Sequence, residues 1–371
     1  MTIDISLVLL HFSLIDDIGP ATIDRLVLYF GSANLAQLYD AGASELKQAG
    51  ISSPTCQKVI SGLANSSLLA KELQLIERAG IRWTTYLSDD YPDALKNIYL
   101  PPAVLYWKGI LPSKDKILAI VGSRDASIYA QKAIDRFVPS LVQYGWAIAS
   151  GGARGADTMA HSATLKAGGT TLAILGSGLL HYYPVQNKYL FNDIIEKGGA
   201  LISPFNVQMQ PLAGNFPARN RIISGLSRGC LVVQAAAKSG ARITAEFSLQ
   251  QGKEVFAIPG IFDDQLSQGC HQLIQQGAKL VTNPEEVLIE FGQVPETTIT
   301  LNSSKTTLLS TEVPIKQSID ETVMSHCKHP CSVDDLIEAT QIPFNELSIV
   351  LFDLQLQGKI TQNMSGLWEK Q

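Results

Sequence analysis

The chain has 371 residues, of which 46% are hydrophobic and 17% are charged, and its 34 acidic residues outnumber 29 basic ones. This composition is typical of a globular protein and argues against disorder, and the length allows two or three domains. No apolar run reaches the roughly 18 residues that a membrane span needs. The N-terminus carries an acid where a signal peptide has basic residues, and the five cysteines are scattered, so we expect a cytoplasmic protein.

The charge is distributed unevenly along the chain. Residues 1–66 hold 3 basic and 6 acidic residues, 67–314 hold 22 and 20, and 315–371 hold 4 and 8. Between Glu196 and Glu246 there is no acid, yet basic residues recur. Buried strands are poor in every charge, which accounts for the missing acids but not for the cations beside them. We therefore expect a polyanion to meet the middle of the chain.

Residues 1–66 are predicted to form a small helical domain. Within it, Ile15–Leu26 (IDDIGPATIDRL) matches the turn of a helix-hairpin-helix motif. DNA-binding versions of this motif hold a backbone phosphate through the amides of the hairpin. The acidic balance of this region favours a structural copy instead.

From residue 67 to 291, short apolar runs alternate with helix-length segments such as 130–144. Repeated strand–helix alternation predicts a doubly wound parallel sheet, an extended Rossmann-like α/β fold, whose ligands bind at the carboxyl ends of the strands. The predicted strands are 117–122, 147–150, 171–176, 201–203, 230–235, 254–259 and 279–282.

Four loops at these predicted strand ends combine small residues with cations. Backbone amides in such turns, together with a helix N-terminus, form a ready phosphate site. Four of them on one sheet edge predict a string of phosphates as the ligand rather than one nucleotide. Tyr182 and Tyr183 follow the third loop and either stack on bases or pack against the sheet. The loops are 122–130, 151–157, 176–178 with 181–188, and 238–244.

Residues 292–314 are predicted to be a linker, and 315–371 have the helix, helix and hairpin pattern of a winged-helix domain. Its second helix has no Lys or Arg between Phe344 and Gln357, so we expect it to make packing or protein contacts rather than to enter a DNA groove.

The segment His326–Cys331 contains two histidines and two cysteines. Without a second pair of ligands it is a weak candidate for a metal site.

Four motifs carry a resemblance to a known family. In chain order they are Gly122-Ser-Arg, Ser150-Gly-Gly-Ala-Arg-Gly-Ala-Asp, Phe216-Pro-Ala-Arg-Asn-Arg-Ile-Ile-Ser and Ser239-Gly-Ala-Arg-Ile-Thr-Ala. Over essentially its whole length the chain resembles the DprA/Smf (DNA-processing protein A) family. The resemblance implies a cytoplasmic, non-enzymatic protein without metal or cofactor that binds and protects single-stranded DNA. It further implies RecA loading during natural transformation and dimerisation through the Rossmann core.

The resemblance also transfers binding roles to matching positions. Two departures from the usual family pattern are Pro204, where many members have Glu, and Gly152, where many have Leu. The first puts one strand end in doubt, whereas the second keeps the neighbouring cation. The predicted DNA- or phosphate-binding residues are Gly122, Ser123, Arg124, Gly151, Arg154, Gly155, Lys188, Arg219, Asn220, Arg221, Ser224, Lys238, Ser239, Gly240 and Arg242.

An enzymatic alternative remains open. The core also resembles Rossmann-like nucleotide phosphoribohydrolases, which pair a glycine-rich phosphate loop with a catalytic glutamate. Here Ser239–Thr244 has a comparable place and Glu246 follows, but the glycines and the spacing both depart from that pattern. A dinucleotide site is less supported, because the turn at Gly122 lacks the three-glycine spacing.

Overall fold

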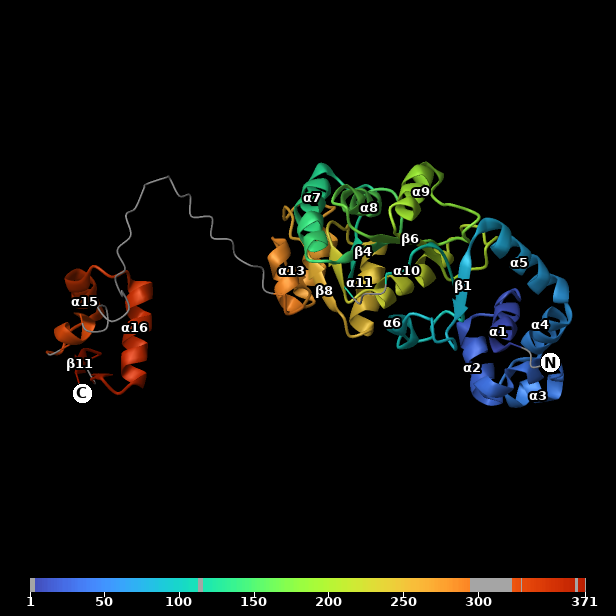
Figure 1. The fold of residues 1–371 in the computed structure, drawn as a ribbon, viewed down its shortest axis with the longest axis horizontal. Coiled ribbons are helices and arrows are strands. Elements are labelled where there is room, and N and C mark those ends of the chain that lie inside the picture. Colours follow the sequence, from blue (N-terminus) through green and yellow to red (C-terminus); the bar gives the residue numbers. More distant parts are fainter. Residues whose placement is uncertain (1–3, 113–115, 294–321, 328, 364–365, 371) are drawn as a thin grey trace, which may run out of the picture. The chain divides into compact units, whose positions relative to one another are not determined.

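The predicted apolar runs form seven parallel strands of a nine-stranded sheet (Figure 1). The strands are β1 (Arg82–Thr85), β2 (Val104–Gly109), β3 (Ile117–Val121), β4 (Ala147–Ser150), β5 (Thr171–Ile174), β6 (Ala200–Ser203), β7 (Gly229–Val232), β8 (Glu254–Ala257) and β9 (Lys279–Leu280). Their order is β1-β2-β6-β5-β4-β3-β7-β8-β9. The predicted fold class is confirmed, with one addition: β2 pairs antiparallel with both β1 and β6 and extends one edge of the sheet.

The computed structural model describes residues 4–112, 116–293, 322–327, 329–363 and 366–370. The chain divides into two units, 1–296 and 297–371. From residue 294 onward the predicted linker lies outside the described residues. Among the helices described there is none long and apolar enough to cross a bilayer.

Helices cover both faces of the sheet, as the strand–helix alternation predicts (Figure 1). One face carries α7 (Ile128–Gln143), α8 (Ala156–Lys166), α9 (Lys188–Glu196) and α13 (Pro284–Glu290), and the other carries α10 (Asn215–Leu226), α11 (Gly240–Gln250) and α12 (Gln268–Gln275). Alternate side chains of each strand enter the two layers, because successive Cβ atoms point to opposite faces. In β3, Leu118 packs with α7, whereas Ala119 packs on the side of α10.

The direction of winding reverses at β3. From β3 the chain adds β4, β5 and β6 on one side, and β7, β8 and β9 follow on the other side. In a doubly wound sheet, this switch point leaves a crevice between the loops that leave the two central strands. The loops after β3 and β7 are two of the four that the sequence singled out.

The first unit begins with a helical region that packs onto the sheet edge. Its elements are α1 (Ile5–Ser13), α2 (Pro20–Phe30), the 3₁₀ helix η1 (Ser32–Tyr39), α3 (Ala43–Gln48), α4 (Ser53–Ala64) and α5 (Ser66–Ala79); a short helix, α6 (Asp93–Lys96), follows β1. The predicted hairpin joins α1 to α2. The buried Glu72 of α5 accepts a hydrogen bond from the Val207 amide (2.8 Å), which ties this region to the loop after β6.

The second unit has the predicted helix, helix and hairpin. Its elements are α15 (Val333–Thr340), α16 (Phe344–Leu356), β10 (Ile360–Gln362) and β11 (Trp368–Lys370). A small core forms between the helices and the hairpin, with Leu336, Leu351 and Ile360 buried in it.

In the described part of the chain, no group of three or more metal-ligating side chains is arranged to hold an ion.

Candidate functional site

Two adjoining hollows open at the switch point of the sheet. The first encloses about 680 Å³ between the loops after β3 and β7 and helix α10. The second encloses about 400 Å³ and is lined by the loops after β4 and β5 and by residues 183–186. Arg124, Ala153, Phe216 and Arg219 line both hollows, so together they form one continuous cleft. All four predicted loops therefore contribute residues to the cleft. The loops after β3 and β7 line the first hollow, the loop after β5 with the segment that follows it lines the second, and the loop after β4 lines both.

The cleft carries exposed cations from three loops. Arg124 follows β3, Arg154 follows β4 and Lys238 follows β7. In the parts of the chain that the structure describes, none of them forms an ion pair with a carboxylate. Lys188 is exposed at the start of α9, next to the segment that lines the second hollow. These charges are therefore available to an anionic ligand.

An aromatic ring lies beside two arginines in the wall that the hollows share. The Cζ atoms of Arg124 and Arg219 lie 5.6 Å and 6.0 Å from the centroid of the Phe216 ring. The ring of Tyr183 lies 5.8 Å from the same centroid and is 47% exposed. Tyr182 instead packs edge-on against Phe191 in the core. Of the two tyrosines, only Tyr183 is thus placed to meet a ligand in the cleft.

Arg219 ties α10 to the ends of two strands. Its side chain is 4% exposed, and Nη1 donates to the carbonyl oxygens of Gly151, after β4, and Ile174, in β5. Nε donates to Oδ1 of Asn220 (3.1 Å). A Cβ atom on Gly151 would lie 2.6 Å from Nη1, so only glycine leaves room for the guanidinium. Arg219 therefore holds α10 against the ends of β4 and β5 and so fixes the wall of the cleft.

Two buried titratable groups lie near this arginine. Burial lowers the pKa of Arg219 to about 10, an effect that Asp157 opposes. Burial raises the pKa of Asp157, while the charge of Arg219 acts in the other direction. Burial, and then the charge of Arg219, lower the pKa of His161 to about 3. His161 is hydrogen-bonded through Nδ1 to Thr171 Oγ1 (2.7 Å), and no partner within the described residues reaches its Nε2.

The loops hold each other through their own amides. The Ser123 amide donates to the Gln234 carbonyl (2.7 Å), and the Ala153 amide donates to Oδ2 of Asp157 (3.2 Å). Gly155 has φ +75°, and a Cβ there would lie 2.4 Å from the Ser123 carbonyl oxygen. Several amides that the sequence suggested as bare are thus engaged within the protein. What these loops offer to an anion is therefore mainly the charge of their side chains.

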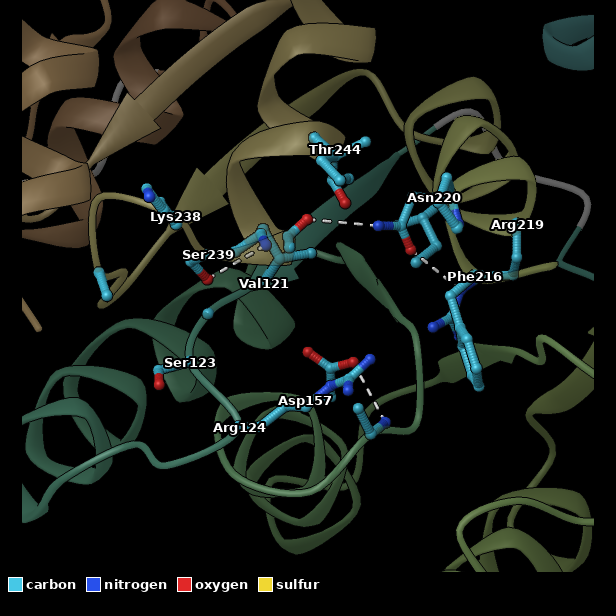
Figure 2. A pocket seen from close by; sticks show the side chains of 18 of the residues that line it. Val121, Ser123, Arg124, Asp157, Phe216, Arg219, Asn220, Lys238, Ser239 and Thr244 are labelled. Atoms are coloured by element: carbon cyan, nitrogen blue, oxygen red, sulfur yellow. Dashed lines mark hydrogen bonds between the residues drawn. The ribbon is translucent and has the colours of Figure 1, made fainter. Parts of the chain in front are cut away.

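The loop after β7 closes the other side of the first hollow. Figure 2 shows Lys238 and Ser239 on one side of the pocket and Phe216, Arg219 and Asn220 on the other. Ser239 caps α11 by accepting from the Ala241 amide (3.3 Å), which fixes the start of that helix. Gly122, Ser123 and Gly240 also line this hollow.

Five predicted residues do not line either hollow of the cleft: Gly155, Lys188, Arg221, Ser224 and Arg242. Arg221 donates to the carbonyl oxygens of Tyr99 and Leu100, and the buried Ser224 donates to Oε1 of Gln251 (2.7 Å). Arg242 donates to Oε1 of Gln272 (2.8 Å) and lines a shallow hollow with Lys238, Gly240 and Glu246. Phe216 and Asp157 also line the cleft but were not predicted as binding residues, although both belong to motifs quoted from the sequence.

Comparisons with known proteins agree with these features. The family model for DNA recombination-mediator protein A matches residues 82–292, and a model for the DprA winged-helix domain matches residues 324–364. DNA processing protein DprA of Streptococcus pneumoniae is 45% identical over 224 residues, which are 60% of this chain and 77% of that protein.

Two solved structures are also similar. The X-ray structure of DprA from Streptococcus pneumoniae matches with a TM-score of 0.67 and 34% identity, over 78% of this chain and 99% of that one. A structure of DNA processing protein A from Helicobacter pylori, described for its single-stranded DNA binding mode, matches with a TM-score of 0.50 and 26% identity, over 57% of this chain and 95% of that one. The chain therefore belongs to the DNA recombination-mediator protein A family, whose relatives carry the names DprA and Smf.

Proposed function

We propose that the chain is a recombination mediator that binds single-stranded DNA in the cleft at the switch point. The observation that carries this proposal is the shared wall, where Phe216 lies beside Arg124, Arg219 and Tyr183. Cations that track a backbone, combined with aromatic rings that stack on bases, are the features that hold single strands without sequence preference. The Helicobacter pylori relative, described for its single-stranded DNA binding mode, supports the same ligand.

The arrangement favours a single strand over a duplex. In a duplex the base faces are stacked on their neighbours, so an aromatic ring can reach them only after unstacking. A single strand presents those faces freely, and each base that stacks on an aromatic ring adds about 1–3 kcal/mol to binding.

The predicted residues divide into separate proposed roles. Arg124, Arg154 and Lys238 contact phosphates, and Lys188 adds a phosphate contact beyond the second hollow. We call these four cations the phosphate track. Asn220, Ser123 and Ser239 add polar contacts. The glycines at 122, 151 and 155 let the loops pack closely behind the cleft, because a Cβ there would meet other protein atoms, and Gly240 leaves open space at the start of α11. Arg219 acts as a positioning residue, because its Nη1 donates to two backbone carbonyl oxygens and its Nε donates to Asn220 Oδ1.

Family membership supports the wider role. We propose that the chain protects the bound strand and loads RecA onto it, that it does so during natural transformation, and that it works as a homodimer assembled through the Rossmann core. The test is RecA filament formation on a strand already covered by a competing single-strand binder, followed with and without the chain. Faster filament growth with the chain supports loading, and an unchanged rate contradicts it.

The proposed activity is binding rather than catalysis. Glu246, the residue that the phosphoribohydrolase alternative requires, is exposed on α11 and does not line either hollow of the cleft. Incubation with nucleoside monophosphates is expected to release no free base. Release that Glu246→Gln abolishes would instead establish the hydrolase.

Binding itself is tested with a labelled oligo-dT titrated at several salt concentrations. The logarithm of the affinity should fall linearly with the logarithm of salt, with a slope of about −0.7 for each phosphate contact. Affinity that does not change with salt would exclude a cationic track.

A further inference from the structure

Helix α16 of the second unit has two apolar faces, and among the residues that the structure describes only one of them is buried. Leu347, Leu351 and Leu354 are buried in the small core of that unit. On another face of the helix, Ile349, Phe352 and Leu356 are 64%, 61% and 71% exposed. Large apolar side chains at this exposure are costly to leave in water unless a partner covers them.

The spacing of the exposed residues fits one class of partner. The steps from 349 to 352 and from 352 to 356 are three and four residues, which puts the three side chains on one face of the helix. Alternating steps of three and four form the seam of a helix–helix contact, in which each side chain inserts between residues of a facing helix. The occupant expected from this geometry is therefore an amphipathic helix.

The acidic residues beside these three apolar side chains favour a partner helix that carries positive charge. Glu346 and Asp353 are exposed, seven residues apart, and therefore lie on one side of the seam; α16 contains no Lys or Arg. Residues 315–371 as a whole hold 8 acidic and 4 basic residues. Duplex DNA would be repelled by this surface, and a second copy of the unit would bring like charge against like.

We propose that α16 binds a basic amphipathic helix of a partner protein. The apolar residues of the partner cover Ile349, Phe352 and Leu356, and its Lys or Arg residues pair with Glu346 and Asp353. This site lies in a different unit from the proposed DNA cleft. It assigns to the second helix of the winged-helix domain a role in protein binding.

The test uses the full chain and two synthetic helical peptides of about 18 residues, long enough to form a helix. Both peptides carry the same leucine face, one with lysine and one with glutamate at the remaining positions. We expect the lysine peptide to bind and the glutamate peptide not to bind. Phe352→Ser should weaken binding of the lysine peptide about tenfold, whereas Leu28→Ser, on α2 of the first unit and 76% exposed, should leave it unchanged.

A charge-reversal variant distinguishes this contact from nonspecific binding of the peptides. In the double variant Glu346→Lys with Asp353→Lys, the preference should invert, so that the glutamate peptide binds and the lysine peptide is lost. The proposal is overturned by equal binding of both peptides, or by no effect of Phe352→Ser. A change of oligomeric mass in Phe352→Ser would also overturn it, because the exposed face would then bind a second copy of the chain. Weaker binding of duplex DNA by the same variant would overturn it too, because the helix would then enter a DNA groove. None of these outcomes depends on whether the cleft binds single strands.

Discussion

Arg124 and Phe216 are in contact in the wall that the two hollows share: Cζ of the arginine, from the loop after β3, lies 5.6 Å from the centroid of the ring at the start of α10. In the proposed function, this contact places the cation that would hold a phosphate beside the ring that would stack on a base. It also brings together two motifs that are about 90 residues apart in the sequence.

Replacing the cation should weaken binding without harming the fold. Arg124 is exposed, and its charge is not paired with a described carboxylate, so Arg124→Ala removes mainly the ligand contact. We expect oligo-dT affinity to fall about tenfold and the salt slope to drop by roughly 0.7 to 1. Arg136→Ala, an exposed arginine of α7, is the matched control. If both variants bind alike, the cleft is not the phosphate track.

The ring of Phe216 should contribute to the binding of DNA bases and not to the binding of the sugar–phosphate backbone. Phe216→Leu keeps an apolar side chain but removes the stacking face, so affinity for oligo-dT should fall about tenfold. Phe216→Tyr should retain it. The same variants are titrated with an abasic strand, whose affinity we expect to be nearly unchanged. An equal loss on the abasic strand would mean that Phe216 acts only by holding the arginines.

Arg219 should affect stability more than any exposed cation does. Removing its side chain leaves Asp157 buried without its compensating charge and leaves two carbonyl oxygens without donors. Leaving a buried acceptor without a donor typically costs about 1–3 kcal/mol. Urea unfolding of Arg219→Ala should show a loss of that order, and Arg136→Ala should show almost none. A variant of unchanged stability that has lost DNA binding would identify Arg219 as a direct ligand instead.

His161 should make the fold sensitive to acid. The unfolded imidazole binds a proton below its usual pKa of 6.5, whereas the folded one does so only at about 3. Between these values the unfolded state binds more protons, so stability falls as pH falls, by up to about 4 kcal/mol. His161→Gln should lose this part of the pH dependence, as thermal unfolding between pH 7 and pH 4 would reveal. Parallel curves for the two proteins would contradict the buried neutral imidazole.

Arg221 provides a contrast within the same helix. Its guanidinium holds the carbonyls of Tyr99 and Leu100 and does not line the cleft. Arg221→Ala should lower the melting temperature by several degrees and leave oligo-dT affinity within about twofold, since the lost hydrogen bonds are internal. A large loss of affinity at unchanged stability would restore the direct contact that the motif suggests.

The sequence predicted the sheet well because buried parallel strands are short apolar runs, and each such run between Ile117 and Leu280 became a strand. The antiparallel strands β1 and β2 were missed. The composition of β1 is mixed, whereas Val104–Trp107 of β2 is a buried apolar run that was not assigned to a strand from the sequence. The four loops were found from glycines and cations. What could not be read was the direction of each side chain: Arg219 and Arg221 are two residues apart in one motif, yet one is buried behind the cleft and the other holds a separate loop. That distinction depends on tertiary packing.

The central claim is that the cleft recognises a single strand. The most direct measurement compares wild-type affinity for one oligonucleotide and for the duplex of the same sequence, at the same salt concentration. Because stacking on Phe216 and Tyr183 needs free base faces, the account predicts a preference for the single strand of at least about tenfold. Equal affinity for the two forms would contradict it.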